Sequence, residues 1–295
     1  MSSKTKENEI LMKRASYASV AVAFSLIVMK LVTFFITGSV AILSSLFDSF
    51  QDVITSCVNV ITIRQANEPA DNKHRFGHGK AQAIGSLIQA FIIVTASCFL
   101  MWESVDRFCH PKELHQISIG LLITVIAIIL TILLVRYQTF VIQKTGSLSI
   151  KADRAHYAGD IMMNVGVIVA MVLSYYLRWT KVDSLFGMGV SLYLFVAVYQ
   201  IIKESFEMLM DTEMPEDFRK EIQNIARSFP QISTIHDLRT RQSGTRAFIQ
   251  FCVHLDNSLT LKQAHDITDK IEDRIKERFP DTDVIIHPEP EREKL

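Results

Sequence analysis

The chain has 295 residues, of which 49% are hydrophobic and 21% are charged, and its mean hydropathy is +0.23. This composition is too apolar for an ordinary soluble protein and too charged for a protein confined to the membrane, so it predicts a membrane domain joined to a soluble domain. The 31 basic residues balance the 31 acidic residues. No global charge therefore attracts nucleic acid, and we expect no nucleic-acid partner.

The four cysteines are scattered without CxxC spacing; they are Cys57, Cys98, Cys109 and Cys252. Two of them lie in apolar segments, so a disulfide framework is not expected. The polar opening MSSKTKENEI lacks the short apolar core and the small-residue cleavage site of a secretory signal. We therefore expect no cleaved signal peptide.

Six apolar segments are each long enough to cross about 30 Å of hydrocarbon as a helix. They cover residues 15–36, 39–63, 81–102, 117–134, 151–177 and 184–202. The sequence therefore predicts a cytosolic tail at residues 1–14, a transmembrane domain of six helices in a lipid bilayer at 15–210, and a cytosolic domain at 211–295.

The basic residues of the connecting segments favour one side of the membrane. Four lie in the N-terminal tail, four in the loop after the second helix and four in the loop after the fourth, against none, two and two on the other side. Lys and Arg concentrate on the cytosolic side of membrane proteins. Both chain termini are therefore predicted to lie in the cytosol.

The soluble part alternates between helical and strand patterns. Helical spacing covers 215–229 and 261–279, and strand alternation covers 234–241, 246–255 and a short segment at 283–287. Ser243-Gly244 separates the first two strands as a hairpin turn. The order αββαβ predicts a small α/β sandwich with both helices on one face of the sheet.

The fifth apolar segment carries two ionisable residues. His156 and Asp160 are four residues apart, so they share one face of a helix, and Asn164 continues that face. Ionisable side chains are costly in hydrocarbon, and this pattern indicates a functional site.

The second apolar segment carries a matching pair, Asp48 and Asp52. Together with His156 and Asp160, they provide four oxygen and nitrogen ligands, which suit a tetrahedral divalent ion, Zn²⁺ first. The alternative is a structural polar contact between helices, which Ser, Thr or Asn would provide at lower cost. The two pairs lie at different depths along their segments. If they meet, the fifth helix begins deep or tilts, or its outer end projects beyond the bilayer.

The loop EPADNKHRFGHGKAQ carries a second candidate site. Asp71, His74 and His78 supply a carboxylate and two imidazoles, and Gly77 and Gly79 allow the backbone to fold around an ion. The alternative is an ordinary solvated loop.

The soluble domain carries a third group of possible ligands. They lie on separate predicted elements and are His236, Cys252, His254, His265, His287 and Glu289. The period of two places Cys252 and His254 on one face of a strand.

The strings DSFQD, PADNKHRFGHGKA, ADRAHYAGDIMMN, HDLRTRQSG and DVIIH together resemble the cation diffusion facilitator family, in particular its bacterial zinc and ferrous-iron efflux pumps. The resemblance covers nearly the whole chain. It implies a homodimeric Zn²⁺/H⁺ antiporter of the bacterial inner membrane, with Fe²⁺ and Cd²⁺ as further substrates. It also implies a metallochaperone-like (ferredoxin-like) cytosolic domain through which the dimer forms and in which Zn²⁺ is structural or regulatory.

The resemblance also assigns residues. It implies a transport site at Asp48, Asp52, His156 and Asp160, a loop site at Asp71, His74 and His78, and a binuclear cytosolic site at His236, Cys252, His265, His287 and Glu289. It further implies a charge interlock between Lys80 and Asp211. Cys252 and Glu289 depart from the family pattern of His and Asp, and His254 is an alternative ligand.

Two other functions compete with transport. An intramembrane zinc enzyme would need an open metal position, whereas the predicted site has four ligands and the chain lacks HExxH. A membrane-anchored metal sensor would not need ionisable residues within the bilayer. We therefore expect an antiporter rather than an enzyme, with His156 as its proton carrier because imidazole titrates near physiological pH.

Overall fold

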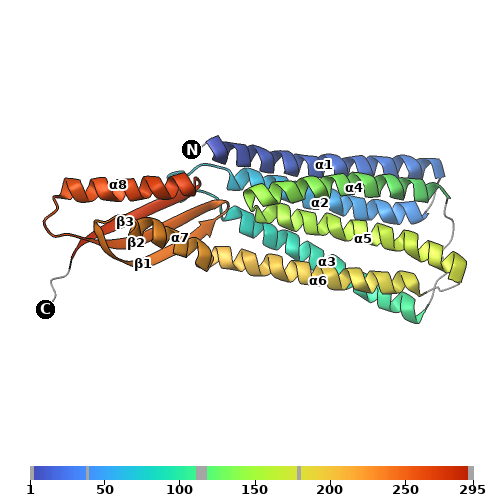
Figure 1. The fold of residues 1–295 in the computed structure, drawn as a ribbon. Coiled ribbons are helices and arrows are strands. Elements are labelled where there is room, and N and C mark those ends of the chain that lie inside the picture. The colour runs from blue at the N-terminus through green and yellow to red at the C-terminus, as the bar shows by residue number, and fades with distance from the viewer. Residues whose placement is uncertain (1–2, 38–39, 111–117, 178–180, 292–295) are drawn as a thin grey trace.

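The computed structural model describes residues 3–37, 40–110, 118–177 and 181–291, and it consists of a helical bundle with a small sheet domain at one end (Figure 1). Six helices form the described bundle: α1 (Ser3–Thr37), α2 (Val40–Ala66), α3 (Ala81–Cys109), α4 (Ser118–Thr145), α5 (Leu148–Leu177) and α6 (Val182–Leu209). Within the described residues, α1, α3, α4 and α6 are long and apolar enough to cross a membrane. The helices that carry the acids and the imidazole, α2 and α5, pack against them.

The outer surface of the bundle is apolar, and its interior mixes apolar clusters with many buried polar side chains. Fully buried polar side chains include Ser19, Asn59, Gln89 and Gln138. Large exposed side chains on the outer surface include Phe35, Phe91, Trp102 and Tyr199. This distribution fits a lipid environment, because lipid covers the apolar side chains and the polar groups lie between the helices, away from it.

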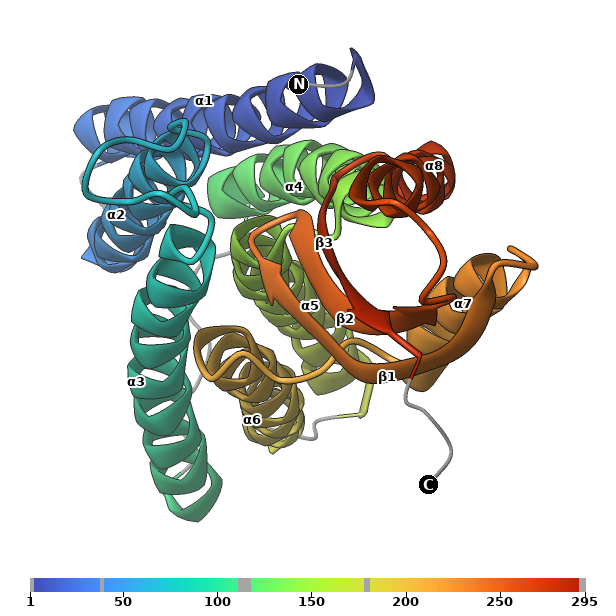
Figure 2. The same ribbon diagram turned by 90° about the vertical axis from the view of Figure 1, so that its left-hand side faces the viewer.

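Two features of the bundle were not indicated by the apolar segments of the sequence. α1 begins at Ser3, well before that pattern starts at residue 15, because Lys and Glu are good helix formers in water. The start of α1 lies at the same end of the bundle as the sheet domain (Figure 1). Figure 2 looks along the bundle from the sheet domain and shows α3 leaning past α6, against which it packs extensively.

The sheet domain has the predicted order αββαβ. Its elements are α7 (Glu216–Arg227), β1 (Ile232–Ser243), β2 (Arg246–Leu255), α8 (Leu261–Arg278) and β3 (Thr282–Pro290). β2 is the central strand, antiparallel to β1 and parallel to β3. The two-residue hairpin turn consists of Gly244 and Thr245, one residue later than the sequence indicates, and Gly244 has the positive φ of +63° that such a turn requires. The predicted membrane bundle with an αββαβ domain is confirmed.

The two faces of the sheet differ in chemistry. Ile249, Phe251 and Val253 point to one face and pack against Ile222 of α7 and Ile271 of α8. Because side chains alternate along a strand, Cys252 and His254 lie on the opposite face, together with their register partners on β1 and β3. One face therefore holds the domain together, and the other is free to bind ligands.

The sheet domain contacts the bundle where two glycines meet. Gly79, at the end of the loop after α2, faces the β1–β2 turn so closely that a Cβ atom on it would lie 2.3 Å from the backbone oxygen of Ser243. A Cβ atom on Gly244 would lie 3.0 Å from Cα of Gly79. The loop and the hairpin are therefore in backbone contact.

We expect Gly79→Ala to force this contact apart. Because the clashing atoms belong to backbone, the strain is about 1–3 kcal/mol, and the midpoint of thermal unfolding of the full chain in detergent should fall by several degrees. Gly189→Ala is the matched control, since a Cβ atom there has nothing within 4 Å. Equal midpoints for the two variants would contradict the contact.

Candidate metal centres

Asp52 of α2 and His156 of α5 meet inside the bundle, where each residue is 8% exposed. His156 Nε2 lies 3.0 Å from Asp52 Oδ1 and 3.8 Å from Asp160 Oδ2. One ligand atom from each of the three residues lies within 4.8 Å of the others. One ion can therefore contact all three, and the imidazole and carboxylate donors fit a divalent metal such as Zn²⁺. Asp48 lies on α2 one turn before Asp52, but its side chain is outside the described residues.

This meeting depends on an axial displacement of α5. His156 is the ninth residue of α5, whereas Asp52 lies 14 residues before α2 ends at Ala66. At 1.5 Å per residue, α5 begins about 9 Å deeper in the bundle than α2 ends. At the far end α5 reaches beyond α2 (Figure 1). Of the arrangements that the sequence left open, the structure has the deep start of α5.

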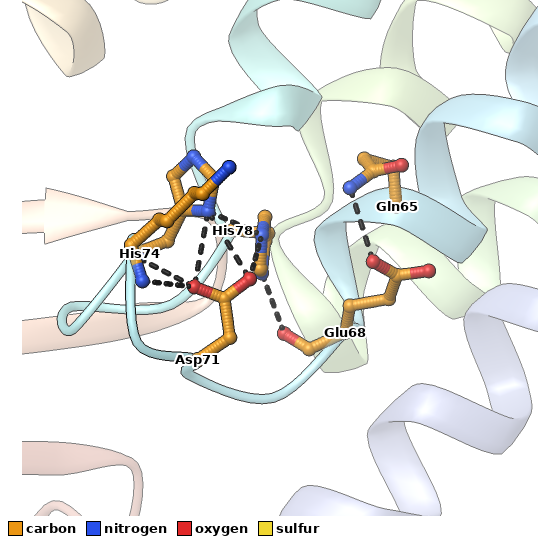
Figure 3. A network of polar contacts seen from close by, with 6 residues as sticks. Gln65, Glu68, Asp71, His74 and His78 are labelled. Carbon is orange, nitrogen blue, oxygen red and sulfur yellow. Dashed lines mark hydrogen bonds and ion pairs between the residues drawn. The ribbon is translucent and has the colours of Figure 1, made fainter.

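The loop after α2 brings together Asp71, His74 and His78, whose ligand atoms also lie within 4.8 Å of one another (Figure 3). His74 Nδ1 lies 3.2 Å from Asp71 Oδ1 and 3.0 Å from His78 Nε2. The other ring nitrogen of His78 lies 3.4 Å from the Glu68 carbonyl oxygen. A carbonyl behind the ring is the usual support of a metal-binding imidazole, because it fixes which nitrogen faces the ion.

The loop keeps its carboxylate ionised. The backbone N–H of His74 donates to Asp71 Oδ1 at 2.6 Å, and the N–H of Lys73 donates to the same oxygen at 2.7 Å. The His74 N–H, followed by the His74 ring, lowers the pKa of Asp71 from 3.8 to about 2. Asp71 is therefore available as an anionic ligand throughout the physiological pH range.

The outer face of the sheet carries the third group, His236, Cys252 and Glu289, again within 4.8 Å. His254 joins it: its Nε2 lies 3.3 Å from Glu289 Oε2, and its ring centroid is 4.8 Å from that of His236. The hydroxyl of Thr234 lies 2.6 Å from His254 Nδ1, which leaves Nε2 facing the group. Nε2 is buried without a hydrogen-bond partner in the described part of the chain. His254 is therefore as well placed as the predicted ligands.

Two predicted ligands of the cytosolic site lie apart from this group. His265 is exposed on α8 and pairs with Asp269 of the same helix at 3.4 Å, because α8 covers the opposite face of the sheet. His287 is on the correct face but exposed, with Nε2 3.9 Å from Glu289 Oε1. Within one chain, the structure thus joins His236, Cys252, His254 and Glu289, and it leaves His265 and His287 outside.

The predicted pair Lys80 and Asp211 forms an ion pair of 2.9 Å where α6 ends and the sheet domain begins. Burial alone would raise the pKa of Asp211, but the hydrogen bond and charge of Lys80, with Arg241, outweigh it and lower this pKa below 3.8. The pair therefore persists at neutral pH and is lost only as acid protonates Asp211.

Arg241 adds a contact that the sequence did not indicate. Its guanidinium lies 4.7 Å from the ring centre of Phe76 and 4.8 Å from that of Phe248, and 3.4 Å from Asp211. Phe76 belongs to the loop after α2 and Phe248 to β2. A planar guanidinium suits such stacking better than an ammonium group. One side chain thus connects the loop, the junction and the hairpin.

Sequence reasoning also missed Asp153 of α5, which is fully buried. Its carboxylate accepts hydrogen bonds from Ser19 of α1 and Gln138 of α4. The sequence feature that could have indicated Asp153 is its position three residues before His156, because this spacing places both residues on the same side of α5.

Comparison with known proteins covers both parts of the chain. The cation efflux transmembrane domain matches residues 16–210, and the cytoplasmic domain of cation efflux proteins matches residues 214–291. The chain belongs to the cation diffusion facilitator family. It is 40% identical, over 280 residues, to the cation-efflux pump FieF of Salmonella choleraesuis strain SC-B67, covering 95% of this chain and 93% of the relative. FieF of Salmonella newport strain SL254 gives the same values.

The cytoplasmic part is similar to solved domain structures. The metal-bound C-terminal domain of the CzcD transporter from Thermotoga maritima is 33% identical, covering 26% of this chain and 94% of that chain, with a TM-score of 0.25. As a member of the cation diffusion facilitator family, the protein is a multi-pass membrane transporter that exports divalent cations, and its C-terminal domain is cytoplasmic.

The cytosolic group predicts a particular reactivity for Cys252. Burial raises the pKa of this thiol above 9.0, and the Glu289 carboxylate raises it further. Because Glu289→Gln removes the negative charge, it should increase the rate of alkylation at Cys252 about three- to tenfold at a fixed pH of about 8. Mass spectrometry of the metal-free protein measures this rate, and exposed Cys109 in the same molecule is the control. An unchanged rate at Cys252 would contradict the arrangement of this group.

Proposed function

We propose that the protein exports Zn²⁺ from the cytosol in exchange for protons, and that Cd²⁺ and Fe²⁺ are further substrates. The observation that carries the proposal is the buried group Asp52, His156 and Asp160, where an imidazole and two carboxylates converge between two helices. Buried ionisable residues in a membrane domain mark the path of an ion or a proton. The mixed nitrogen and oxygen donors favour Zn²⁺ over Mg²⁺ or Ca²⁺, which bind oxygen alone.

Competition between protons and metal couples the two fluxes. His156 and Asp52 share a hydrogen bond of 3.0 Å, so His156 Nε2 holds a proton or points a lone pair at the same place that the metal occupies. A metal binds only a neutral imidazole and ionised carboxylates, so its entry from the cytosol releases protons. The loaded site then opens to the other side, where protons return and release the ion. His156 is the proton carrier in the ligand set.

The loop and cytosolic groups are proposed as additional Zn²⁺ sites. Their donors fit the metal: two imidazoles and a carboxylate in the loop, and two imidazoles, a thiol and a carboxylate on the sheet. His236, Cys252, His254 and Glu289 would form a site within one chain, with a structural or regulatory ion.

We also propose a homodimer that forms through the cytosolic domain. Ile285 of β3 is 55% exposed, and the period of two places it on the same sheet face as His287 and Glu289. A second chain would cover this apolar residue. The protein would lie in the bacterial inner membrane with both termini in the cytosol, as the distribution of Lys and Arg indicates.

Metal flux into proteoliposomes under an imposed pH gradient tests the proposal. Wild-type protein should move ⁶⁵Zn²⁺ only when the gradient is present, and Asp52→Asn should reduce this flux at least about a hundredfold, because it removes a charged ligand. Asp106→Asn is the matched control, since this carboxylate lies near the far end of α3. Flux that ignores both the gradient and Asp52→Asn would exclude the antiporter.

Selectivity provides a separate test of the ligand set. His156→Asp keeps four candidate ligands but replaces the nitrogen donor by oxygen, so we expect weaker discrimination between Zn²⁺ and the larger Cd²⁺. The ratio of Zn²⁺ to Cd²⁺ transport in proteoliposomes measures this change. A ratio equal to that of the wild type would show that His156 does not set metal preference.

A further inference from the structure

A further carboxyl group, that of Asp153, lies buried beside the transport site and outside its ligand set. Asp153 is 0% exposed, and its Oδ2 accepts a hydrogen bond of 2.6 Å from Ser19 Oγ and one of 2.7 Å from Gln138 Nε2. Gln138 Nε2 also donates to Ser19 Oγ at 3.0 Å. The three residues come from α5, α1 and α4, and none of them is exposed.

A purely structural role does not account for an acid at this position. The side chains that hydrogen-bond to Asp153 are neutral, and His156 lies on the same helix without a direct hydrogen bond to it, so burying this carboxylate is costly. Asn or Ser would connect the three helices at lower cost. The carboxyl group is therefore expected to do something that an amide or a hydroxyl cannot do, and the property that distinguishes it is the ability to gain and lose a proton.

The surroundings provide hydrogen bonds for both protonation states. Ser19 Oγ lies 2.6 Å from Asp153 Oδ2 and also 3.1 Å from the Ala15 carbonyl oxygen. When Asp153 is ionised, the Ser19 hydroxyl donates to the carboxylate. When Asp153 is protonated, its own O–H donates to Ser19 Oγ, and the Ser19 hydroxyl turns to the Ala15 carbonyl. Neither state leaves the Ser19 hydroxyl without an acceptor, so the proton can be exchanged without moving a helix.

Its place along α5 puts Asp153 on the cytosolic side of the metal ligands, because α5 starts at the end of the bundle that carries the cytoplasmic domain (Figure 1). On α2, Thr55 and Asn59 follow Asp52 in the same direction. Both are fully buried; the Asn59 side chain acts on Asp153, and the Thr55 hydroxyl has no hydrogen-bond partner in the described part of the chain. Unpaired buried polar atoms are the usual partners of internal water, which can carry a proton.

We propose that Asp153 carries one of the protons exchanged for the metal, as a proton-binding residue that does not itself ligate the ion. The proposal rests on the proposed antiport. When the divalent cation enters the transport site, its positive charge favours the ionised carboxylate, and the O–H bond of Asp153 breaks, releasing the proton to cytosolic water. After the metal leaves on the other side, a proton that enters through the empty site restores the O–H bond.

Few other titratable groups act on Asp153. Asp52 faces it from α2, and His156 and Tyr157 act on it from its own helix. α1 and α4 present the neutral Ser19 and Gln138. Among these groups, the charge that changes during transport is therefore the charge of the metal site. Metal binding there acts on the protonation of Asp153.

The number of protons exchanged per metal ion tests this assignment in the full-length protein. In proteoliposomes with the membrane potential held at zero, the Zn²⁺ gradient that stops net flux is measured at several pH gradients, and its slope gives the number of protons per ion. Asp153→Asn should lower this slope by about one relative to the wild type and to Asp106→Asn, because Asn accepts the same two hydrogen bonds but carries no exchangeable proton.

A second variant covers the case in which Asp153→Asn does not fold. Ser19→Ala keeps the carboxyl group of Asp153, so the number of protons exchanged per Zn²⁺ ion should equal that of the wild type. The ionised carboxylate loses the stronger hydrogen bond, so the pH profile of transport should move upward by about 0.5–1 pH unit.

Each result has a definite meaning. An unchanged slope in an active Asp153→Asn protein, or an unmoved pH profile in Ser19→Ala, overturns the role of Asp153 and leaves the antiport intact. A wild type whose Zn²⁺ gradient does not respond to pH overturns the antiport and this inference together.

Discussion

The cost of placing ionisable groups in a low-dielectric bundle is the constraint on which this architecture depends. Asp52 and His156 lie 3.0 Å apart and are almost without exposure. A carboxylate and an imidazole at this distance compensate each other, whereas either one alone would be an uncompensated buried group. The two helices must therefore hold their relative depth, and α5 begins deeper than α2 ends. The apolar exterior of the bundle and the position of its polar side chains between the helices follow from the same cost, because lipid provides no hydrogen-bond partners.

Much of this organisation could be predicted from the sequence because it depends on local periodicity. Four-residue spacing identified His156 and Asp160 on one helix face, and two-residue spacing placed Cys252 and His254 on one strand face. Strand boundaries were less certain: β1 extends two residues beyond its alternating segment at each end, and a bulge between His236 and Arg239, with Asp237 at a φ of +52°, interrupts the alternation inside it.

The contacts that could not be predicted join residues far apart in the chain. Asp52 and His156 are separated by 104 positions, and no local pattern gives the axial displacement that brings them together. Asp153 was overlooked because its value as a site depends on Ser19 and Gln138, which look ordinary in sequence. His265 was grouped with the sheet ligands by residue type, yet α8 packs on the other face of the sheet. Tertiary placement decides each of these cases.

The loop after α2 has an unusual property for an exposed connection. Its candidate metal ligands alternate with residues that contact the sheet domain: His74 precedes Phe76, which contacts Arg241 and Phe248, and His78 precedes Gly79, which contacts the hairpin backbone. Surface loops usually tolerate insertions and deletions, because their residues act independently. Here the insertion or deletion of one residue would displace the candidate ligands relative to the residues that contact the sheet domain. The length of this loop is therefore as constrained as that of a buried strand.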